Sequence, residues 1–348
     1  NNIYVAAVTH TTVSTILLTL FVAINQAFFM GFFFMISSYF TPGSYDRKGA
    51  GAYVLDRLKR LGIPLLFYIV VIDPLLNFVM ARYYGFTGSL GHFIRLHLQY
   101  SLDNQALGVG PLWFVAALLI FSLGYVLWRL LPLPEINLVR SDGKAPSNLA
   151  IAVFALVLGL LTFLVRIWIP VGVQFDLLGI QLAHFVQYIA MFIVGILAYR
   201  GDWFAGISNS QGKFWLWMVL ILIVLFPVLF VAAGALEGNP DKAFGGIHWQ
   251  SLAYSVWEQF MCMAMVVTLL VWFRIRFKHQ GSLAPKMSAE AYATYIFNGP
   301  TITLLALVLV SISLDLALKF VLVAPLAVAL SFLVGYIVKQ LPVARDIV

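Results

Sequence analysis

The sequence has few charged residues and almost no cysteine. Asp, Glu, Lys and Arg make up 10% of its 348 residues, against about 25% in a soluble domain. The single cysteine, Cys262, excludes an internal disulfide and says nothing about the redox compartment. The chain has no Walker loop, no dinucleotide-binding glycine fingerprint and no Cys/His cluster with metal-ligand spacing. Nucleotide hydrolysis and a metal site are therefore not predicted.

Apolar residues, in contrast, make up 62% of the chain, and the mean hydropathy is +0.96. Nine apolar stretches have the length of about 20 residues that crosses a bilayer core. They are continuous rather than alternating, which favours helices over barrel strands. The sequence shows no internal repeat, and no loop between the stretches is long enough for a soluble domain. The sequence predicts an all-α integral membrane protein, a polytopic helical bundle forming one domain over residues 1–348. The approximate limits of the spans are Thr12–Phe40, Leu61–Met80, Pro111–Leu131, Asn148–Trp168, Leu177–Tyr199, Phe214–Ala233, Ser251–Phe273, Ala289–Val310 and Asp315–Val338.

The distribution of Lys and Arg predicts the orientation. Sixteen of the 21 lie in alternate loops on one side, and five lie on the other. Because cytoplasmic loops accumulate Lys and Arg, the C-terminus is predicted to be cytoplasmic and Asn1 extracytoplasmic. The same topology explains the net charge of +7 without a nucleic-acid partner. Since the chain starts outside and with Asn, we expect one further span before it, giving ten in the full protein.

The first cytoplasmic loop holds the densest cluster of charge. Arg57 and Arg60 are three residues apart, which on an α-helix places both guanidinium groups on one face, where they can bind the same phosphate. Lys59 points away from that face but adds a third cation. Positive charge that only anchors the loop in the cytoplasm would look the same. Spacing alone leaves both interpretations open.

Three segments resemble the acyltransferase 3 family of integral membrane proteins, including its glucan-succinylating members. They are Asn25–Pro42, Arg57–Leu66 and Gly110–Leu119, with a weaker likeness over Ser288–Asn298. The resemblance implies ten spans and transfer of an acyl group, acetyl or succinyl, from cytoplasmic acyl-CoA to a hydroxyl of an extracytoplasmic carbohydrate. It also implies a bacterial inner membrane, and acyl-CoA phosphates bound by an Arg-x-x-Arg element that falls on Arg57 and Arg60.

The catalytic histidine of that family belongs to the first span, which we expect to be missing here. Within the spans present, His184 and Glu258 are candidates for a general base on the acceptor hydroxyl or for groups that orient the missing histidine. Each is equally explained as a packing residue hydrogen-bonded between helices.

Four further residues are candidates for the substrate pocket: Asn25, Asp73, Trp113 and Asn298. Trp113 has an alternative role as an interfacial anchor. Asn298 stands where the family often has histidine. The prolines that follow Asp73 and Asn298 predict interrupted helices, whose freed backbone groups would line a polar cavity or find protein partners.

Two other classes of protein remain as alternatives. Interior polar residues and broken helices are also typical of a secondary transporter or flippase, although no two related halves are visible in the sequence. A non-catalytic membrane subunit would explain the absent catalytic helix. An upstream span containing Arg and His would argue against it.

Overall fold

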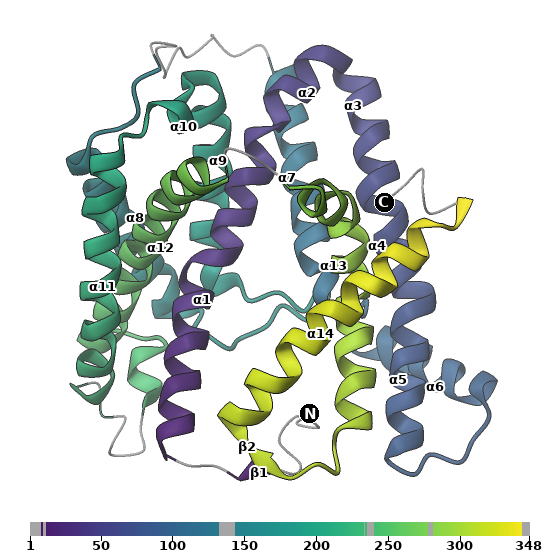
Figure 1. The fold of residues 1–348 in the computed structure, drawn as a ribbon. Coiled ribbons are helices and arrows are strands. Elements are labelled where there is room, and N and C mark those ends of the chain that lie inside the picture. The colour runs from purple at the N-terminus through teal and green to yellow at the C-terminus, as the bar shows by residue number, and fades with distance from the viewer. Residues whose placement is uncertain are drawn as a thin grey trace.

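The computed structural model describes residues 8–9, 12–131, 143–232, 234, 240–277 and 281–342. Within these ranges nine helical segments are long and apolar enough to cross a bilayer, which confirms the predicted polytopic bundle (Figure 1). They are α1 (Thr12–Tyr39), α3 to α5 (Ala50–Tyr83), α7 (Trp113–Leu130), α8 (Asn148–Trp168), α9 (Phe185–Gly201), α11 (Asn209–Ala232), α12 (Trp249–Arg276), α13 (Leu283–Val308) and α14 (Leu316–Lys339).

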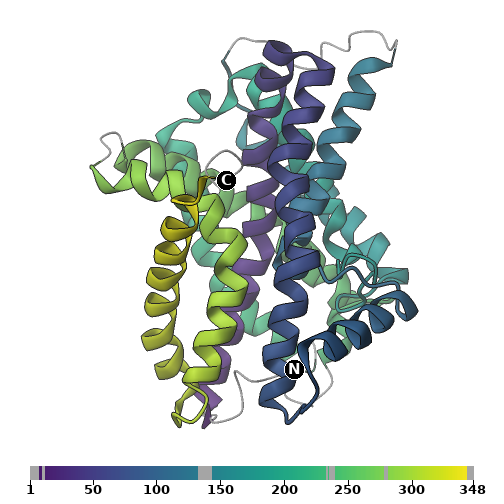
Figure 2. The ribbon, with the colours of Figure 1, turned by 90° about the vertical axis from the view of Figure 1, so that its right-hand side faces the viewer.

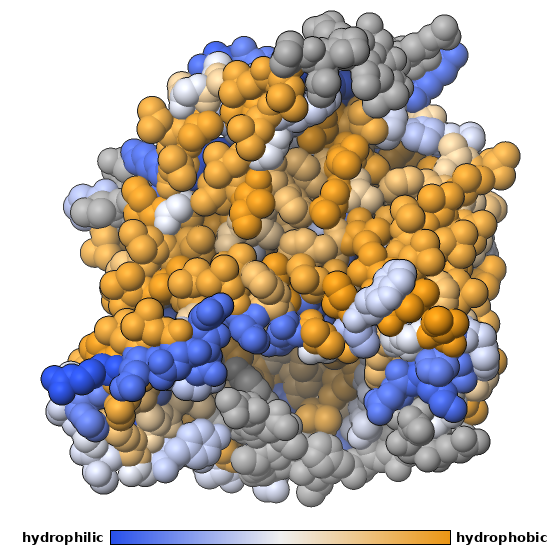
Figure 3. All heavy atoms as spheres, turned by 180° about the vertical axis from the view of Figure 1, so that it is seen from behind, coloured by the Kyte–Doolittle hydropathy of each residue, from blue (hydrophilic) through white to orange (hydrophobic). Residues whose placement is uncertain are grey.

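Apolar side chains cover the outside of the bundle. Leu149 on α8 and Val224 on α11 are exposed over 74% and 71% of their surface, values that only a lipid solvent would favour. The rear view shows a broad apolar belt with hydrophilic residues gathered toward its upper and lower ends (Figure 3). The belt has the appearance expected of a hydrocarbon-facing surface.

Helix α12 is the centre of one half of the bundle, because it packs against α8, α11 and α1. Trp215 and Met261 are fully enclosed in this half. Helix α1 also packs along α9, and a second core lies where Phe34 of α1 stacks on Tyr188 of α9 at 5.2 Å. The pair α13 and α14 completes the fold on the other side of α1 (Figure 1).

Charged loops meet at one end of the bundle, here called the basic end, where the short helix α2 (Thr41–Lys48) leads into α3 (Ala50–Arg57). Asp46 of α2 accepts ion pairs from Arg200 at 2.8 Å and Arg129 at 3.6 Å. Three loops that were predicted to share one side of the membrane are therefore in contact.

The opposite end carries helix α6 (Leu90–Asp103), which runs obliquely to the bundle (Figure 2). The Ser89 side chain caps this helix by accepting from the His92 amide. Here a short parallel strand pair, β1 (Val8–Thr9) with β2 (Leu314–Asp315), joins the start of the described chain to α14. Asp315 caps α14 and accepts hydrogen bonds from Ser14.

The predicted break at Asp73–Pro74 is wrong. The chain stays helical from Ala50 to Tyr83, and it passes two prolines by widening into π-helical turns at Leu58–Gly62 and Tyr68–Ile72. Pro64 cannot donate to the Arg60 carbonyl four residues earlier. The hydroxyl of Tyr292, on α13, donates to that carbonyl instead at 2.7 Å. A neighbouring helix thus supplies the hydrogen bond that lipid cannot.

The α13 helix and the start of the fifth span also differ from prediction. Helix α13 continues through Asn298 and Pro300 to Val308, with the Thr301 hydroxyl donating to the Phe297 carbonyl. The fifth span begins at Leu182 and not at Leu177. Gly179 adopts a φ of +58°, a left-handed conformation that a helix excludes, so this segment forms a turn before the span.

Gly195 allows α1 and α9 to approach closely. A Cβ at this position would overlap the Met35 carbonyl oxygen and the Ser38 hydroxyl of α1. We predict that Gly195→Ala forces the helices apart and destabilises the protein by about 1–3 kcal/mol, measured as thermal unfolding in detergent. Gly124→Ala, on α7 with no atom within 4 Å of the added methyl, is the control and should not destabilise. Equal melting temperatures for the two variants would contradict the close approach.

Candidate functional site

Three charged or titratable side chains meet inside the bundle, toward the end opposite the basic end. Arg166 comes from the last turn of α8, Glu258 from α12, and His184 from the 3₁₀ turn η5 (Leu182–His184) before α9. Arg166 Nη2 lies 2.5 Å from Glu258 Oε2. His184 Nδ1 lies 3.2 Å from the same Nη2 and 3.1 Å from Glu258 Oε1. The structure therefore brings together the two residues predicted as catalytic, and adds an arginine to them.

This ion pair is fully enclosed, with Arg166 exposed by 0% and Glu258 by 1%. Arg166 also donates to the Ser255 hydroxyl at 3.2 Å, and its guanidinium carbon lies 5.3 Å from the Tyr254 ring centre. Removing two charges from water is expensive, and only close pairing with further hydrogen bonds offsets that cost. The observed contacts provide both.

A chain of amides extends the cluster toward α1. Gln187 of α9 donates to Gln259 Oε1 of α12 at 3.0 Å and to the Ala27 carbonyl of α1 at 2.8 Å. Gly31 leaves room on α1 for the Gln187 side chain, since a Cβ there would lie 3.1 Å from its Oε1. One buried polar network thus links four helices. Arg166 joins α8 to α12, and the Gln187 side chain joins α9 to α12 and to the backbone of α1.

The network has unused hydrogen-bonding capacity. Several buried polar atoms lack a hydrogen bond within the described ranges, and five of them belong to α8, α9 and α12 around the ion pair: Thr162 Oγ1, Arg166 Nε, Gln187 Oε1, Ser251 Oγ and Glu258 Oε1. Buried groups without partners are uncommon in native proteins and indicate water or a ligand. Their concentration marks this region as the candidate site.

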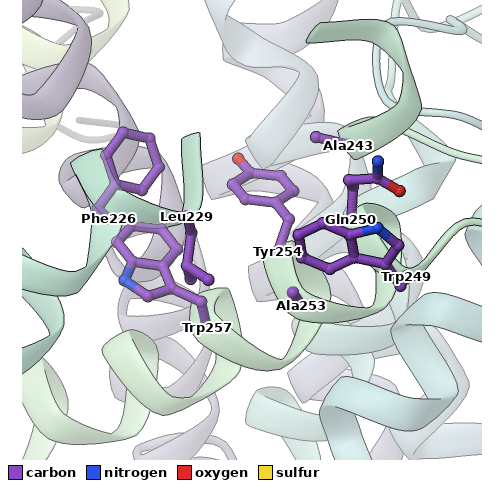
Figure 4. A pocket seen from close by; sticks show the side chains of 8 residues that line it. All are labelled: Phe226, Leu229, Ala243, Trp249, Gln250, Ala253, Tyr254 and Trp257. Carbon is purple, nitrogen blue, oxygen red and sulfur yellow. The ribbon is translucent and has the colours of Figure 1, made fainter. Parts of the chain in front are cut away.

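A small cavity of about 20 Å³ adjoins the cluster on its α11 side (Figure 4). Tyr254 lies between Trp257 and Gln250 in its wall and contacts Arg166 through its ring. This volume is about that of one water position, so the cavity has no room for a sugar ring.

The predicted phosphate site lies at the basic end. Arg57 is half-buried, its guanidinium lies over the Tyr53 ring at 4.9 Å, and its Nε has no hydrogen bond within the described chain. Arg60 pairs with Asp56 at 3.3 Å, and Lys59 is exposed. The π-helical turn starts directly after Arg57, so the two arginines do not keep the α-helical spacing from which a shared face was predicted.

The four candidate pocket residues do not form one cluster, because no hydrogen bond or ion pair among the described residues joins any two of them. Trp113 lies nearest the charge cluster, with its ring 5.7 Å from that of Tyr188, which in turn stacks against His184. Asp73 pairs with His97 of α6 at 2.9 Å, and Asn298 accepts from Ser331 of α14. Asn25 donates only to the Phe21 carbonyl of its own helix.

Arg166 is the site residue that sequence reasoning missed, because it was counted only among the five basic residues of the less basic side. An arginine inside an apolar span is itself the signal, since such a charge needs a buried partner. No group of three metal-ligating side chains occurs within the described ranges.

Comparison with known proteins gives one result that decides the family. The family model of the acyltransferase 3 domain, described as an acyltransferase domain, matches residues 3–339. The chain belongs to the acyltransferase 3 family. Membership supports a membrane acyltransferase in general, and it confirms the resemblance first noticed in three segments of the sequence. Searches among curated proteins and among solved structures return no significant match.

The buried ion pair leads to a prediction about stability. Glu258→Leu leaves the Arg166 charge without a partner and should destabilise this acyltransferase 3 protein by about 3–5 kcal/mol, as should Arg166→Met. The double variant should lose less than either single one, because both charges leave together. Thermal unfolding of the four proteins gives the coupling energy. Additive losses would show that the two residues do not act as a pair.

Proposed function

We propose that this protein transfers an acyl group, acetyl or succinyl, from cytoplasmic acyl-CoA to a hydroxyl of an extracytoplasmic carbohydrate. Its family supports acyl transfer in a membrane. Residues at the two ends of the bundle support the donor, the acceptor and the sidedness. The proposal includes a bacterial inner membrane as the location.

The single observation that carries the donor assignment is the state of Arg57. Its Nε is buried without a hydrogen-bond partner in the described chain, next to the exposed cations Lys59 and Arg60. A partly desolvated guanidinium that has a free donor favours a phosphate oxygen. Coenzyme A carries several phosphates, so acyl-CoA fits the chemistry of this surface.

The charge distribution supports the sidedness. Lys and Arg concentrate in the loops of the basic end, where Arg129 and Arg200 converge on Asp46. By the positive-inside rule this end faces the cytoplasm, where acyl-CoA is made available. The Arg166–Glu258–His184 cluster then lies in the outer half of the bundle, on the side from which a carbohydrate arrives.

The proposed reaction takes the acyl group from a donor bound at the basic end to an acceptor in the opposite half of the bundle. The acceptor oxygen forms a bond to the thioester carbonyl carbon while the carbon–sulfur bond breaks. The hydroxyl proton finally resides on the coenzyme A thiol, so no further reactant is needed. His184 and Glu258 are the titratable groups nearest the expected acceptor position and remain the candidate catalytic residues. Trp113, half-buried beside Tyr188, offers an apolar wall for a sugar ring.

Arg57→Ala should weaken acetyl-CoA or succinyl-CoA binding by about tenfold or more, and Arg57→Ala/Arg60→Ala should weaken it further, because charge-assisted hydrogen bonds to phosphate are lost. Lys59→Ala should have the smallest effect of the three. Binding is measured by titration calorimetry on protein in nanodiscs.

Arg276→Ala is the matched control, since Arg276 is an exposed cation at the end of α12 that was assigned to the same side. Its affinity for acyl-CoA should stay within about twofold of the parent protein. If all four variants bind equally well, the phosphate site lies elsewhere.

Orientation has a separate test. Cys262 is fully buried, so Cys262→Ala provides a background without a native thiol. On it, Lys48→Cys should be labelled by a membrane-impermeant maleimide only after the membrane is opened, whereas Arg95→Cys on α6 should be labelled in intact cells. The reverse pattern would overturn both the topology and the cytoplasmic donor site.

A further inference from the structure

Helices α13 and α14 lie side by side at the edge of the bundle (Figure 2). Gly335 lets them come close, since a Cβ at this position of α14 would lie 2.6 Å from the Thr294 hydroxyl of α13. The Lys339 side chain donates to the Ala289 carbonyl. The last turn of α14 is therefore fixed beside the first turns of α13, at the basic end.

A groove of about 640 Å³ lies beside this contact, between the first turns of α13 and the middle of α14. Its volume is in the range of ligand-binding pockets. Pro325, Val328 and Phe332 form its wall on α14. Val328 is exposed over 55% of its surface, so this wall belongs to the lipid-facing surface of the bundle. An apolar groove that opens toward lipid is suited to a hydrocarbon chain.

Two opposite charges line the same groove on its α13 side. Lys286 and Glu290 are four residues apart, which places them one helical turn from each other. Neither forms an ion pair or a hydrogen bond through its side chain within the described ranges, and Glu290 Oε2 is buried. A carboxylate at the edge of a membrane is costly without a cation beside it, so the groove lacks a counter-ion that a ligand can supply.

A zwitterionic headgroup satisfies both side chains. Its phosphate pairs with Lys286, and a primary ammonium has three N–H donors for Glu290. A trimethylammonium group has no N–H and is typically bound by several aromatic rings, whereas Phe332 is the one aromatic side chain among the described residues that line the groove. An anionic headgroup would leave Glu290 without a cation and repel it.

We propose that this groove binds one phospholipid with an ethanolamine headgroup. An acyl chain lies against Val328 and Phe332, the phosphate pairs with Lys286, and the ammonium donates to Glu290. The site is separate from acyl transfer, because none of these residues belongs to the proposed donor or acceptor sites.

Headgroup selection is tested by native mass spectrometry of the whole chain, with dioleoyl phosphatidylethanolamine or dioleoyl phosphatidylcholine added. The ethanolamine lipid should bind about tenfold more tightly, because only its ammonium donates a charge-assisted hydrogen bond. Glu290→Gln should reduce this preference to about twofold or less. Asp202→Asn, which removes an exposed carboxylate at the end of α9, is the control and should keep the parent preference. Equal binding of the two lipids by the parent protein, or an unchanged preference in Glu290→Gln, overturns the proposal.

The phosphate contact has its own variant. Lys286→Gln should weaken binding of both lipids about fivefold, because both carry the phosphate. Lys213→Gln, at an exposed lysine of α11, is the matched control and should change neither affinity by more than about twofold. Equal effects of the two substitutions would show that Lys286 does not bind the headgroup.

The position of the acyl chain is tested by filling the groove. Ala329 is an exposed residue of its α14 wall, so Ala329→Trp should abolish the ethanolamine preference while the melting temperature in detergent stays at the parent value. An unchanged preference places the lipid elsewhere. If the parent protein is instead a lipid-free dimer that Ala329→Trp dissociates, the groove is an interface between two copies, and the lipid site is overturned.

Discussion

The salt bridge between Arg166 and Glu258 is the interaction on which the inner arrangement of this bundle depends. A charge inside the bilayer core is not hydrated, so Arg166 and Glu258 each require the other as a counter-ion at close range. The pair joins α8 to α12, and α12 is also the helix against which α11 and α1 pack. The Gln187–Gln259 bridge extends the same polar network to α9 and α1. Apolar packing alone discriminates poorly between possible helix neighbours in lipid. These polar side chains, in contrast, have few alternative hydrogen-bond partners.

The network also fixes where chemistry can take place. Exposed and half-buried cations lie at the basic end, while the enclosed Arg166–Glu258–His184 cluster lies inside the opposite half. A phosphorylated carrier and a neutral hydroxyl compound are recognised by different forces, the first by charge and the second by directional hydrogen bonds. The proposed transfer between substrates from opposite sides of the membrane would require such a separation of the two kinds of surface.

The sequence predicts the nine spans because continuous hydrophobicity is a local property. It fails where the outcome depends on another helix. The second span stays helical past Pro64 with Tyr292 of α13 donating to the Arg60 carbonyl, and α13 continues through Pro300, where a break was predicted. His184 and Glu258 stand out as polar residues in spans, but Arg166, 18 and 92 residues away from them, becomes their partner only through tertiary packing. Residue spacing cannot show that contact.

The two π-helical turns in the second span have a consequence for how this chain tolerates change in length. A π-helical turn holds one more residue than the α-helical turn it replaces, so each is a local reserve of chain within a segment that must still cross the membrane. Deleting one residue from an ordinary membrane helix rotates everything beyond it by about a quarter of a turn. A deletion inside either turn would instead convert it to α-helix and keep both flanking faces in register, which makes these turns the places where the second span can lose a residue without re-pairing its neighbours.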